Sequence, residues 1–359
     1  MGKHDPIDRP SEARANEAPD MERLLAYLRQ HLPGLTDTCS LLQYPGGFSN
    51  LTFLLQCGSK EYILRMPPRG ADIKSAHDMG RESTVLRLLK PVYPKVPSVM
   101  LYCEDAAVVG RPFYLMEKME GIILRNKVPE GLELGAERMR AISEAAVDNL
   151  ASLHSIDIVQ SGLIELGKPE GYVRRQVEGW IGRYQKSKTD DVPDMDLAAA
   201  WMMNHIPPDN PPAFIHNDYK YDNLVLDPAQ PERIVGVLDW EMATVGDPLM
   251  DLGTTLAYWA EETDGPVLKP FNLTWLPGNL SRAEVVSRYA HSRGIAEPDM
   301  LYYFVFGSYK IAVIVQQIYA RFRKGLTSDP RFGQLHHVVK ACAANAAGAI
   351  RKSRISNLV

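Results

Sequence analysis

The sequence predicts an α+β protein with two lobes, the first mainly β and the second mainly helical. The chain has 359 residues, which is more than one compact core usually holds. Short apolar and β-branched segments dominate residues 39–117, whereas long segments with helical periodicity dominate residues 121–352. We therefore expect a disordered arm over residues 1–20, an N-terminal lobe over residues 21–118 and a C-terminal lobe over residues 119–359.

Three segments of the first lobe have the composition of β-strands. Residues 51–56 and 61–66 are apolar and β-branched runs, and residues 108–117 hold a third strand after a turn. One helix, at residues 76–89, interrupts the strands. Glu82 lies on the inward face of this helix, where an unpaired charge is costly, so we expect it to have a cationic partner.

The second lobe is predicted to be mainly helical because its apolar residues recur with a period near 3.6. The expected helices cover residues 136–156, 249–259, 283–293, 300–324 and 334–352, with two more inside residues 168–206 around an acidic break. Two short strands are expected at residues 223–226 and 234–238.

The overall composition excludes several classes of protein. Lys and Arg number 40 against 44 Asp and Glu, so the basic excess typical of nucleic-acid binding is missing. No segment has the roughly 18 uninterrupted apolar residues of a membrane helix, and the first twenty residues lack the apolar stretch of a secretory signal. The cysteines show no C-x-x-C or zinc spacing: Cys39, Cys57, Cys103 and Cys342. We therefore expect a cytoplasmic protein with reduced cysteines that binds neither nucleic acid nor membranes.

The most informative segment is residues 216–223, which read HNDYKYDN and fit the pattern H-x-D-x-K-x-x-N. Asp218, Lys220 and Asn223 fall on one short loop, and Asp239 ends an apolar run shortly afterwards. Phosphoryl transfer needs such groups. We expect Asp218 to accept or orient the acceptor hydroxyl and Lys220 to neutralise the transferring phosphate. Asn223 and Asp239 are the expected ligands of Mg²⁺, which prefers oxygen atoms.

Four further residues are expected to support this loop. His216 is interpreted as a structural residue that holds the loop to the strand of Asp239, and His154 as a packed core histidine. Asp247 precedes Pro248 and is expected to cap a helix. Asp251, one turn inside that helix, is expected to accept hydrogen bonds from backbone N–H groups of the loop.

A glycine-rich segment between two expected strands is a candidate phosphate-binding loop. The adjacent Gly46 and Gly47 allow a close approach of the backbone, and Ser49 offers a hydroxyl together with the N–H groups up to Asn50. An ordinary hairpin turn is the alternative interpretation. The position of the segment, upstream of the other site residues, favours phosphate binding.

With these motifs the chain resembles the aminoglycoside phosphotransferase and choline kinase-like family of small-molecule kinases, over about residues 25–350. The resemblance rests on the loop at 216–223, on Leu238-Asp239-Trp240 and on the segment from Gly246 to Asp251. It is closest to a branch that also occurs fused to acyl-CoA dehydrogenases. That branch shares the motifs at residues 64–68, 81–82 and 214–220.

The resemblance implies a protein-kinase-like bilobal fold, ATP or GTP as donor, Mg²⁺, and a small hydroxylated acceptor. Hydroxyacyl compounds, amino alcohols and aminoglycosides are candidate acceptors. Arg65 takes the place of the strand lysine that holds the nucleotide phosphates, with Glu82 as its partner. The Glu117 carbonyl and the Met119 N–H would meet the adenine edge.

Two interpretations remain open. The first is an active kinase of a small metabolite, and the second is a nucleotide-binding pseudokinase with a regulatory role, which only Arg65 favours. A P-loop hydrolase is excluded because the chain has no G-x-x-x-x-G-K-[ST] segment. A protein kinase is disfavoured because D-F-G and A-P-E are missing. The sequence leaves open the acceptor, the donor base, the oligomeric state and the effect of Arg65 on activity.

Overall fold

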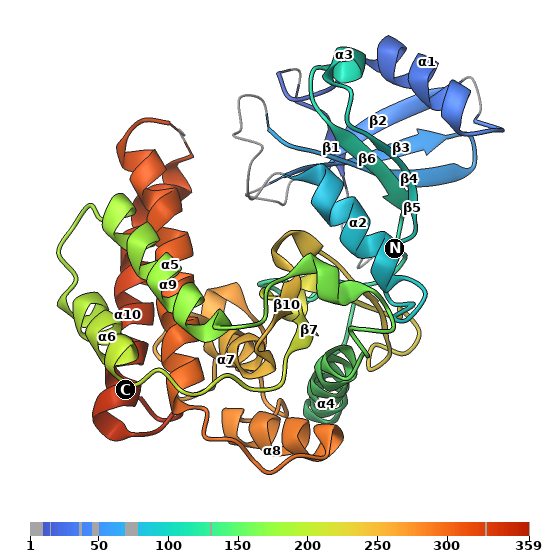
Figure 1. Cartoon of the computed structure of the whole chain (residues 1–359). Coiled ribbons are helices and arrows are strands. Elements are labelled where there is room, and N and C mark those ends of the chain that lie inside the picture. The colour runs from blue at the N-terminus through green and yellow to red at the C-terminus, as the bar shows by residue number, and fades with distance from the viewer. Residues whose placement is uncertain are drawn as a thin grey trace.

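The computed structural model describes residues 10–14, 16–35, 38–44, 50–68, 78–129, 131–326 and 329–358. These residues form the two expected lobes, a sheet lobe and a helical lobe (Figure 1). The candidate loop residues Gly46, Gly47 and Ser49 lie outside the described part of the chain.

The first lobe is built on an antiparallel sheet of six strands in the order β1-β2-β3-β4-β6-β5. The strands are β1 (Ser11–Glu12), β2 (Cys39–Gln43), β3 (Leu51–Cys57), β4 (Lys60–Met66), β5 (Val99–Cys103) and β6 (Phe113–Glu117). The strands predicted near residues 51–56 and 61–66 are confirmed, and the third begins only at Phe113 because the helix α3 (Ala106–Val109) precedes it.

Helices cover both faces of this sheet, so its strands are apolar on both sides. Phe53 and Leu55 pack with α1 (Met21–His31) in one cluster, while Leu54 and Ile63 pack with α2 (Met79–Leu89) in the other. This alternation follows from the period of two along a strand. Because both faces of the sheet are covered, successive residues such as Phe53, Leu54 and Leu55 are all buried, which explains the continuous apolar runs of these strands.

The segment expected to be a disordered arm is ordered where the structure describes it. Ser11 and Glu12 pair with Leu42 and Gln43 as an edge strand. Arg111 also donates to the carbonyl of Glu17. The polar sequence of this segment gave no indication of these contacts, because the segment makes both of them through backbone groups and needs no apolar side chains for them.

The expectation of four reduced cysteines is wrong for two of them. Cys39 on β2 and Cys57 on β3 stand directly opposite each other and form a disulfide, with Cα atoms 4.2 Å apart. Their separation of 18 residues in the sequence matches no recognised spacing, so only the strand register reveals the pair. Cys103 and Cys342 are free and buried.

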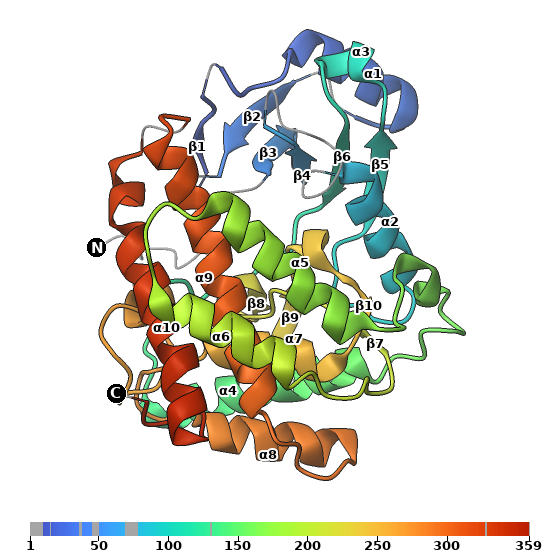
Figure 2. The same cartoon turned by 60° about the vertical axis from the view of Figure 1, so that its left-hand side comes forward.

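The second lobe consists of packed helices around α9, which contacts α5, α6, α7 and α10 (Figures 1 and 2). The helices are α4 (Ala136–His154), α5 (Tyr172–Ser187), α6 (Pro193–Asn204), α7 (Pro248–Tyr258), α8 (Arg282–Arg293), α9 (Leu301–Arg323) and α10 (Leu335–Lys352). Short 3₁₀ helices are η1 (Leu163–Leu166), η2 (Tyr221–Asn223), η3 (Trp240–Met242), η4 (Lys269–Phe271) and η5 (Pro330–Gln334). Every helix predicted for this lobe is present with similar bounds. Within the described residues, no helix has the length and apolarity to cross a membrane.

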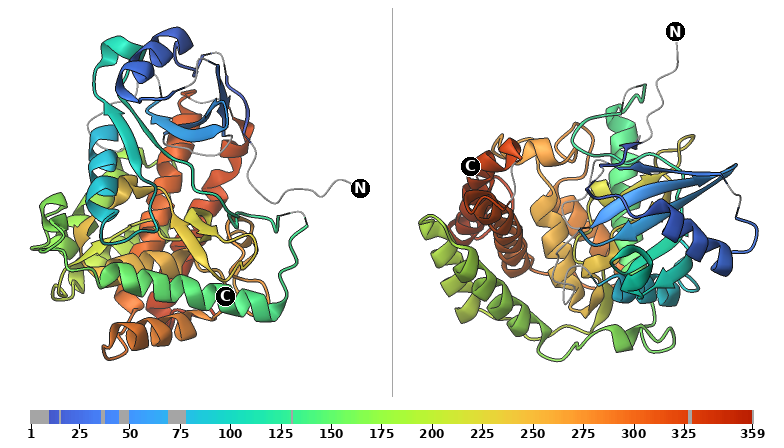
Figure 3. Two further views of the ribbon diagram at one scale, coloured as in Figure 1. Left: turned by 90° about the vertical axis from the view of Figure 1, so that its right-hand side faces the viewer. Right: turned by 90° about the horizontal axis from the view of Figure 1, so that it is seen from above.

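Two small antiparallel sheets lie where the lobes meet (Figure 3). In one, β7 (Ala213–Ile215) pairs with β10 (Thr244–Gly246), and in the other β8 (Leu224–Leu226) pairs with β9 (Ile234–Val237). The motif loop at residues 216–223 connects β7 to β8, and Asp239 follows β9. The two sheets therefore bring the motif segments together.

Helices α7 and α9 approach each other closely because glycines face each other across their contact. A Cβ atom on Gly253 would lie 2.3 Å from the carbonyl oxygen of Tyr303, and one on Gly307 would lie 2.4 Å from that of Gly253. Neither distance is compatible with a side chain. The contact places α9 directly against the helix that supports the motif loop.

Candidate active site

The carboxylate of Asp251 on α7 anchors the motif loop at residues 216–223, which we call the catalytic loop. The two Asp251 carboxylate oxygens accept from the backbone N–H groups of His216 and Asn217, both at 2.7 Å. Asp251 is fully buried. Burial opposes its ionisation, but His154 and nearby positive charges hold its pKa below the ordinary value. The expected contact between Asp251 and the loop backbone is confirmed.

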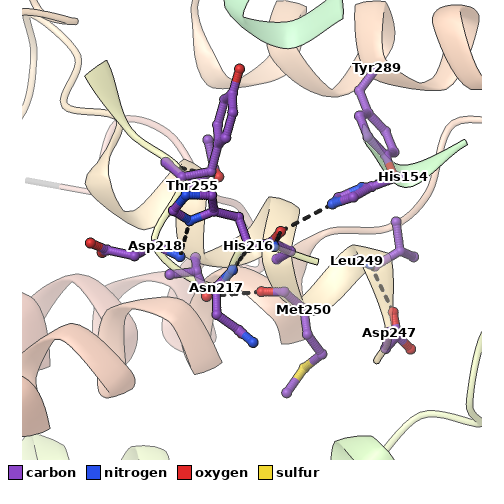
Figure 4. Close-up of polar contacts among 12 residues, drawn as sticks. His154, His216, Asn217, Asp218, Asp247, Leu249, Met250, Thr255 and Tyr289 are labelled. Carbon is purple, nitrogen blue, oxygen red and sulfur yellow. Dashed lines mark hydrogen bonds and ion pairs between the residues drawn. The ribbon is translucent and has the colours of Figure 1, made fainter. Parts of the chain in front are cut away.

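His154 completes this anchor and is a packed core histidine, as expected. Its Nε2 lies 3.1 Å from Asp251, and its Nδ1 lies 2.7 Å from the Tyr289 hydroxyl (Figure 4). Burial lowers the pKa of His154, although Asp251 partly opposes this shift. We call Asp251, His154, His216 and Asn217 the Asp251 cluster.

Asp247 caps α7 as predicted. Its carboxylate accepts from the Leu249 N–H at 2.8 Å, and Pro248 occupies the first turn (Figure 4). The other carboxylate oxygen accepts from the side chain of Asn210 at 2.9 Å. The cap fixes the start of the helix that carries Asp251.

His216 links the catalytic loop to the segment of Asp239. The Asp218 N–H donates to His216 Nδ1 at 3.2 Å, so Nδ1 carries the lone pair and Nε2 the proton. Nε2 then donates to the Leu238 carbonyl at 2.9 Å. These bonds confirm the interpretation of His216 as a structural residue.

Asp218 has a carboxylate with a cation on one side and an amide on the other. Lys220 Nζ lies 3.2 and 2.9 Å from its two oxygens, and Asn223 Nδ2 donates to one of them at 3.1 Å. Burial opposes the ionisation of Asp218, but the charge of Lys220 holds its pKa below the ordinary value. Asp218 is therefore an ionised acceptor of hydrogen bonds at neutral pH. Lys220 also lies 4.6 Å from the centre of the Tyr258 ring.

A second group of charges surrounds Arg65 on β4. Its guanidinium lies 2.9 Å from Glu82, 3.2 Å from Asp239 and 3.9 Å from Glu241. Asn50 donates to Glu241 at 2.8 Å. Burial raises the pKa of Glu82, and Arg65 opposes this shift. We call these five residues the Arg65 cluster.

Asp239 connects the two lobes at this point. It adopts a left-handed backbone conformation with φ at 66°, which is uncommon for a residue other than glycine and directs attention to a site. About a third of its side chain is exposed, at 36%. Its carboxylate is therefore accessible to a ligand as well as to Arg65.

A cavity opens between the lobes and joins these residues. Arg65, Asn223 and Asp239 contribute to one part of its lining. Apolar side chains form another part of the wall: Ile63, Leu86, Met116, Val225 and Leu238. Glu117 and Met119, the residues whose backbone is expected to meet the adenine edge, also line it. A flat base between apolar side chains with phosphates at the charged end fits this distribution.

The side-chain oxygens of Asn223 and Asp239 fit a magnesium ion whose other ligands come from phosphates and water. In the described part of the chain, no three His, Cys, Asp or Glu side chains are placed to hold a metal. Asp239 and Asn223 offer one carboxylate and one amide oxygen on the same cavity. Mg²⁺ takes one or two protein ligands of this type when phosphates and water supply the others.

Sequence reasoning assigned no role to three residues that the structure brings to this region. Glu241 joins the Arg65 cluster. Arg81, beside Glu82 on α2, donates to the carbonyls of Leu166 at 2.9 Å and Ala243 at 2.7 Å, and so ties α2 to the second lobe. Lys310 on α9 contacts the catalytic loop. The sequence offered two signals: the charge of Lys310 inside an apolar helix and the position of Arg81 in the motif at residues 81–82.

The fold and this site define a phosphotransferase of the kinase-like class. Residues 40–285 match the model of the phosphotransferase enzyme family, and the chain belongs to that family.

The chain is also similar to curated relatives and to solved structures. The chain is 38% identical over 318 residues to rat acyl-CoA dehydrogenase family member 11. That match covers 86% of this chain but 40% of the relative, so the chain spans less than half of the rat protein's length. A Ralstonia eutropha protein assigned as an aminoglycoside phosphotransferase superposes with a TM-score of 0.78 at 29% identity, covering 93% of this chain and 99% of that one. Choline kinase from Cryptosporidium parvum shares the fold, with a TM-score of 0.64 at 13% identity, covering 94% and 98%.

Proposed function

We propose that this chain is a small-molecule kinase that transfers the γ-phosphoryl group of ATP or GTP to a hydroxyl group of a small metabolite. The observation that carries the proposal is the position of Asn223. Its side chain donates to the Asp218 carboxylate and also lines the cavity with Arg65 and Asp239. Asp218, the carboxylate proposed to act on the acceptor, is thus adjacent to the charged end of the cavity proposed to hold the nucleotide.

The proposed reaction is an in-line displacement at the γ-phosphorus. The acceptor oxygen forms a bond to phosphorus, the bond to the bridging oxygen of the nucleoside diphosphate breaks, and the hydroxyl proton passes to Asp218. Lys220, 2.9 Å from Asp218, neutralises charge on the transferring group. Asn223 and Asp239 would hold Mg²⁺, which supplies electrostatic stabilisation of the phosphate oxygens.

Nucleotide binding is assigned to the cavity between the lobes. Arg65 would hold phosphate oxygens with Glu82 as its partner, and the backbone of Glu117 and Met119 would meet the base. Asn50 and the preceding segment with Gly46, Gly47 and Ser49 would cover the phosphates. Structural neighbours solved with GDP or with ADP support a purine nucleotide donor.

The acceptor is proposed from the relatives rather than from the cavity. The rat relative carries the name of an acyl-CoA dehydrogenase family member, which favours a hydroxyacyl compound. Structural neighbours named as choline kinase and as a kanamycin-bound phosphotransferase make amino alcohols and aminoglycosides the other acceptors to test. Fold alone does not decide among them.

A regulatory pseudokinase is the second candidate, and the Arg65 cluster is the observation that favours it. An arginine already paired with Glu82 and Asp239 is bulkier than the usual lysine and less free to follow a phosphate. In this case the chain would bind a nucleotide without transferring its phosphate.

One experiment separates the two candidates. Magnesium-dependent ADP release from ATP would be measured with hydroxyacyl thioesters, amino alcohols and aminoglycosides, in wild-type protein and in Asp218→Asn. An active kinase shows turnover with one acceptor class, and Asp218→Asn lowers it by about 10²- to 10⁴-fold while ATP still raises the melting temperature. Equal turnover in both proteins would remove Asp218 from its role. A thermal shift with ATP but no turnover on any acceptor would favour the pseudokinase.

A further inference from the structure

Lys310 is a buried lysine in the middle of α9, and the proposed reaction does not use it. Its exposed fraction is 1%. Its Nζ donates to the backbone carbonyl of Asn217 at 2.6 Å and lies 3.3 Å from the Asn217 side-chain oxygen. The ring of Trp180 on α5 lies 5.8 Å away. Burying an ammonium group costs free energy that a neutral side chain would not, so this position suggests a purpose for the charge.

The carbonyl that Lys310 binds belongs to the peptide group between Asn217 and Asp218. Asn217 adopts a left-handed conformation with φ at 68°. The N–H of the same peptide group donates to His216 Nδ1 at 3.2 Å, and His216 Nε2 donates to the Leu238 carbonyl at 2.9 Å. A continuous chain of hydrogen bonds therefore runs from Lys310, past the backbone of Asp218, to the residue that precedes Asp239.

Charges from three neighbouring parts of the molecule face Lys310. Asp251 on α7 and Asp218 on the catalytic loop favour its protonated form. Lys220 on the same loop and Arg183 on α5 oppose it. The Lys310 ammonium is therefore attracted both by the carboxylate that anchors the loop and by the carboxylate proposed to receive the acceptor proton.

We propose that Lys310 is a positioning residue for Asp218, an inference that rests on the kinase function proposed above. Its ammonium holds the peptide group between Asn217 and Asp218 in one orientation. That orientation directs the Asp218 N–H to His216 and keeps His216 protonated on Nε2. In this way Lys310 on α9 fixes the position of the Asp218 carboxylate relative to the Asp239 segment.

The proposal has a consequence for pH. Burial lowers the pKa of Lys310 to about 8, against the opposing charges of Asp251 and Asp218. Lys310 is protonated below this value and neutral above it. A neutral amine is a weaker donor to the Asn217 carbonyl, so the turnover number should fall as the pH rises through about 8.

The test compares Lys310→Met with Gln316→Met in the full chain, using whichever acceptor class gives turnover in the experiment described under the proposed function. Gln316 is a matched control because it lies on the same helix, is 3% exposed and donates to the Ser187 carbonyl at 2.7 Å, away from the catalytic loop. Lys310→Met should lower kcat by about 10- to 100-fold, leave KM for ATP unchanged and abolish the alkaline decline. Gln316→Met should keep the wild-type kcat and pH profile. A wild-type kcat and alkaline decline in Lys310→Met would overturn the proposal.

A second measurement does not depend on activity or on the folding of a variant. The protein has nine histidines; with ¹⁵N-labelled histidine, the His216 resonances can be assigned from their absence in His216→Asn. In wild-type protein the two His216 nitrogens should show the Nε2–H tautomer and shift together as pH passes about 8. Shifts that stay constant across this range would overturn the role of Lys310 even if the kinase is active. A shift without any phosphoryl transfer would support the coupling and count against the kinase function alone.

Discussion

The Arg65 cluster and the Asp251 cluster differ in how their charges are balanced. In the Arg65 cluster three carboxylates, Glu82, Asp239 and Glu241, face one guanidinium. In the Asp251 cluster one carboxylate receives two backbone N–H groups and a histidine, and Lys310 lies nearby. Among the described residues, carboxylates outnumber cations in the first cluster, which lines a cavity, while the second cluster is neutralised inside the protein.

The difference in exposure agrees with the difference in charge. The Asp239 side chain is 36% exposed, whereas that of Asp251 is fully buried. An accessible carboxylate is suited to a divalent cation that arrives with a nucleotide. A buried, saturated carboxylate is suited to holding a loop in one geometry. One cluster is therefore built to receive ligands and the other to keep the catalytic loop fixed.

The largest expected effect comes from removing the accessible carboxylate. Asp239→Ala should lower phosphoryl transfer by about 10³-fold and weaken ATP binding mainly in the presence of Mg²⁺, because a metal ligand is lost. Calorimetric titration with ATP, with and without Mg²⁺, checks this.

Asp227→Ala is the control for this variant. Asp227 begins the turn between β8 and β9, at the other end of the hairpin from Asp239. Its substitution should leave phosphoryl transfer and Mg²⁺-dependent ATP binding unchanged. ATP affinity in Asp239→Ala that retained its full dependence on Mg²⁺ would show that the metal is held elsewhere.

The next effect should be on stability rather than on binding. Asp251→Asn places an amide against two backbone donors, so we expect the free energy of unfolding to fall by about 2 kcal/mol. Urea denaturation measures this change. Asp148→Asn is the control, because Asp148 forms a half-exposed ion pair with Arg288 and should cost at most about 1 kcal/mol.

The sign of the pH dependence follows from the lowered pKa of Asp251. Its contribution is present above the unfolded-state pKa, near ~3.9, and is lost as the pH falls toward the folded-state value. The difference in stability between wild type and Asp251→Asn should therefore shrink in acid. A difference that grew as the pH fell would contradict an ionised Asp251 in the folded protein.

The smallest effect is expected from Arg65→Lys. A single ammonium cannot reach Glu82 and Asp239 with separate nitrogens as Arg65 does. ATP affinity should fall by about 3- to 10-fold. Titration with ATP and Mg²⁺ measures it, with Arg288→Lys on the surface as the control. Tighter ATP binding in Arg65→Lys would contradict the proposal that the arginine holds phosphate oxygens of the nucleotide.

The helices and the main strands were predictable because their apolar periodicity is local information. The loop at residues 216–223 was predictable because its residue types and spacing are tied to one chemistry. The pairing of Cys39 with Cys57 and the edge strand β1 depend on strand register, which no local pattern reports. Lys310 contacts Asn217 across 93 positions of the sequence, a separation that no local pattern spans.

The contact between α7 and α9 carries one further consequence. Two hydrogen atoms, in place of side chains at Gly253 and Gly307, set the spacing between the helix that anchors the catalytic loop and the helix that carries Lys310. A single methyl group there would clash with a backbone carbonyl oxygen of the facing helix, and the separation that follows would move the Lys310 ammonium away from the Asn217 carbonyl. Substitutions at these glycines would therefore lower activity without removing any catalytic group. They would do so by increasing the distance between the two helices, and a survey of inactivating substitutions should interpret them in that way.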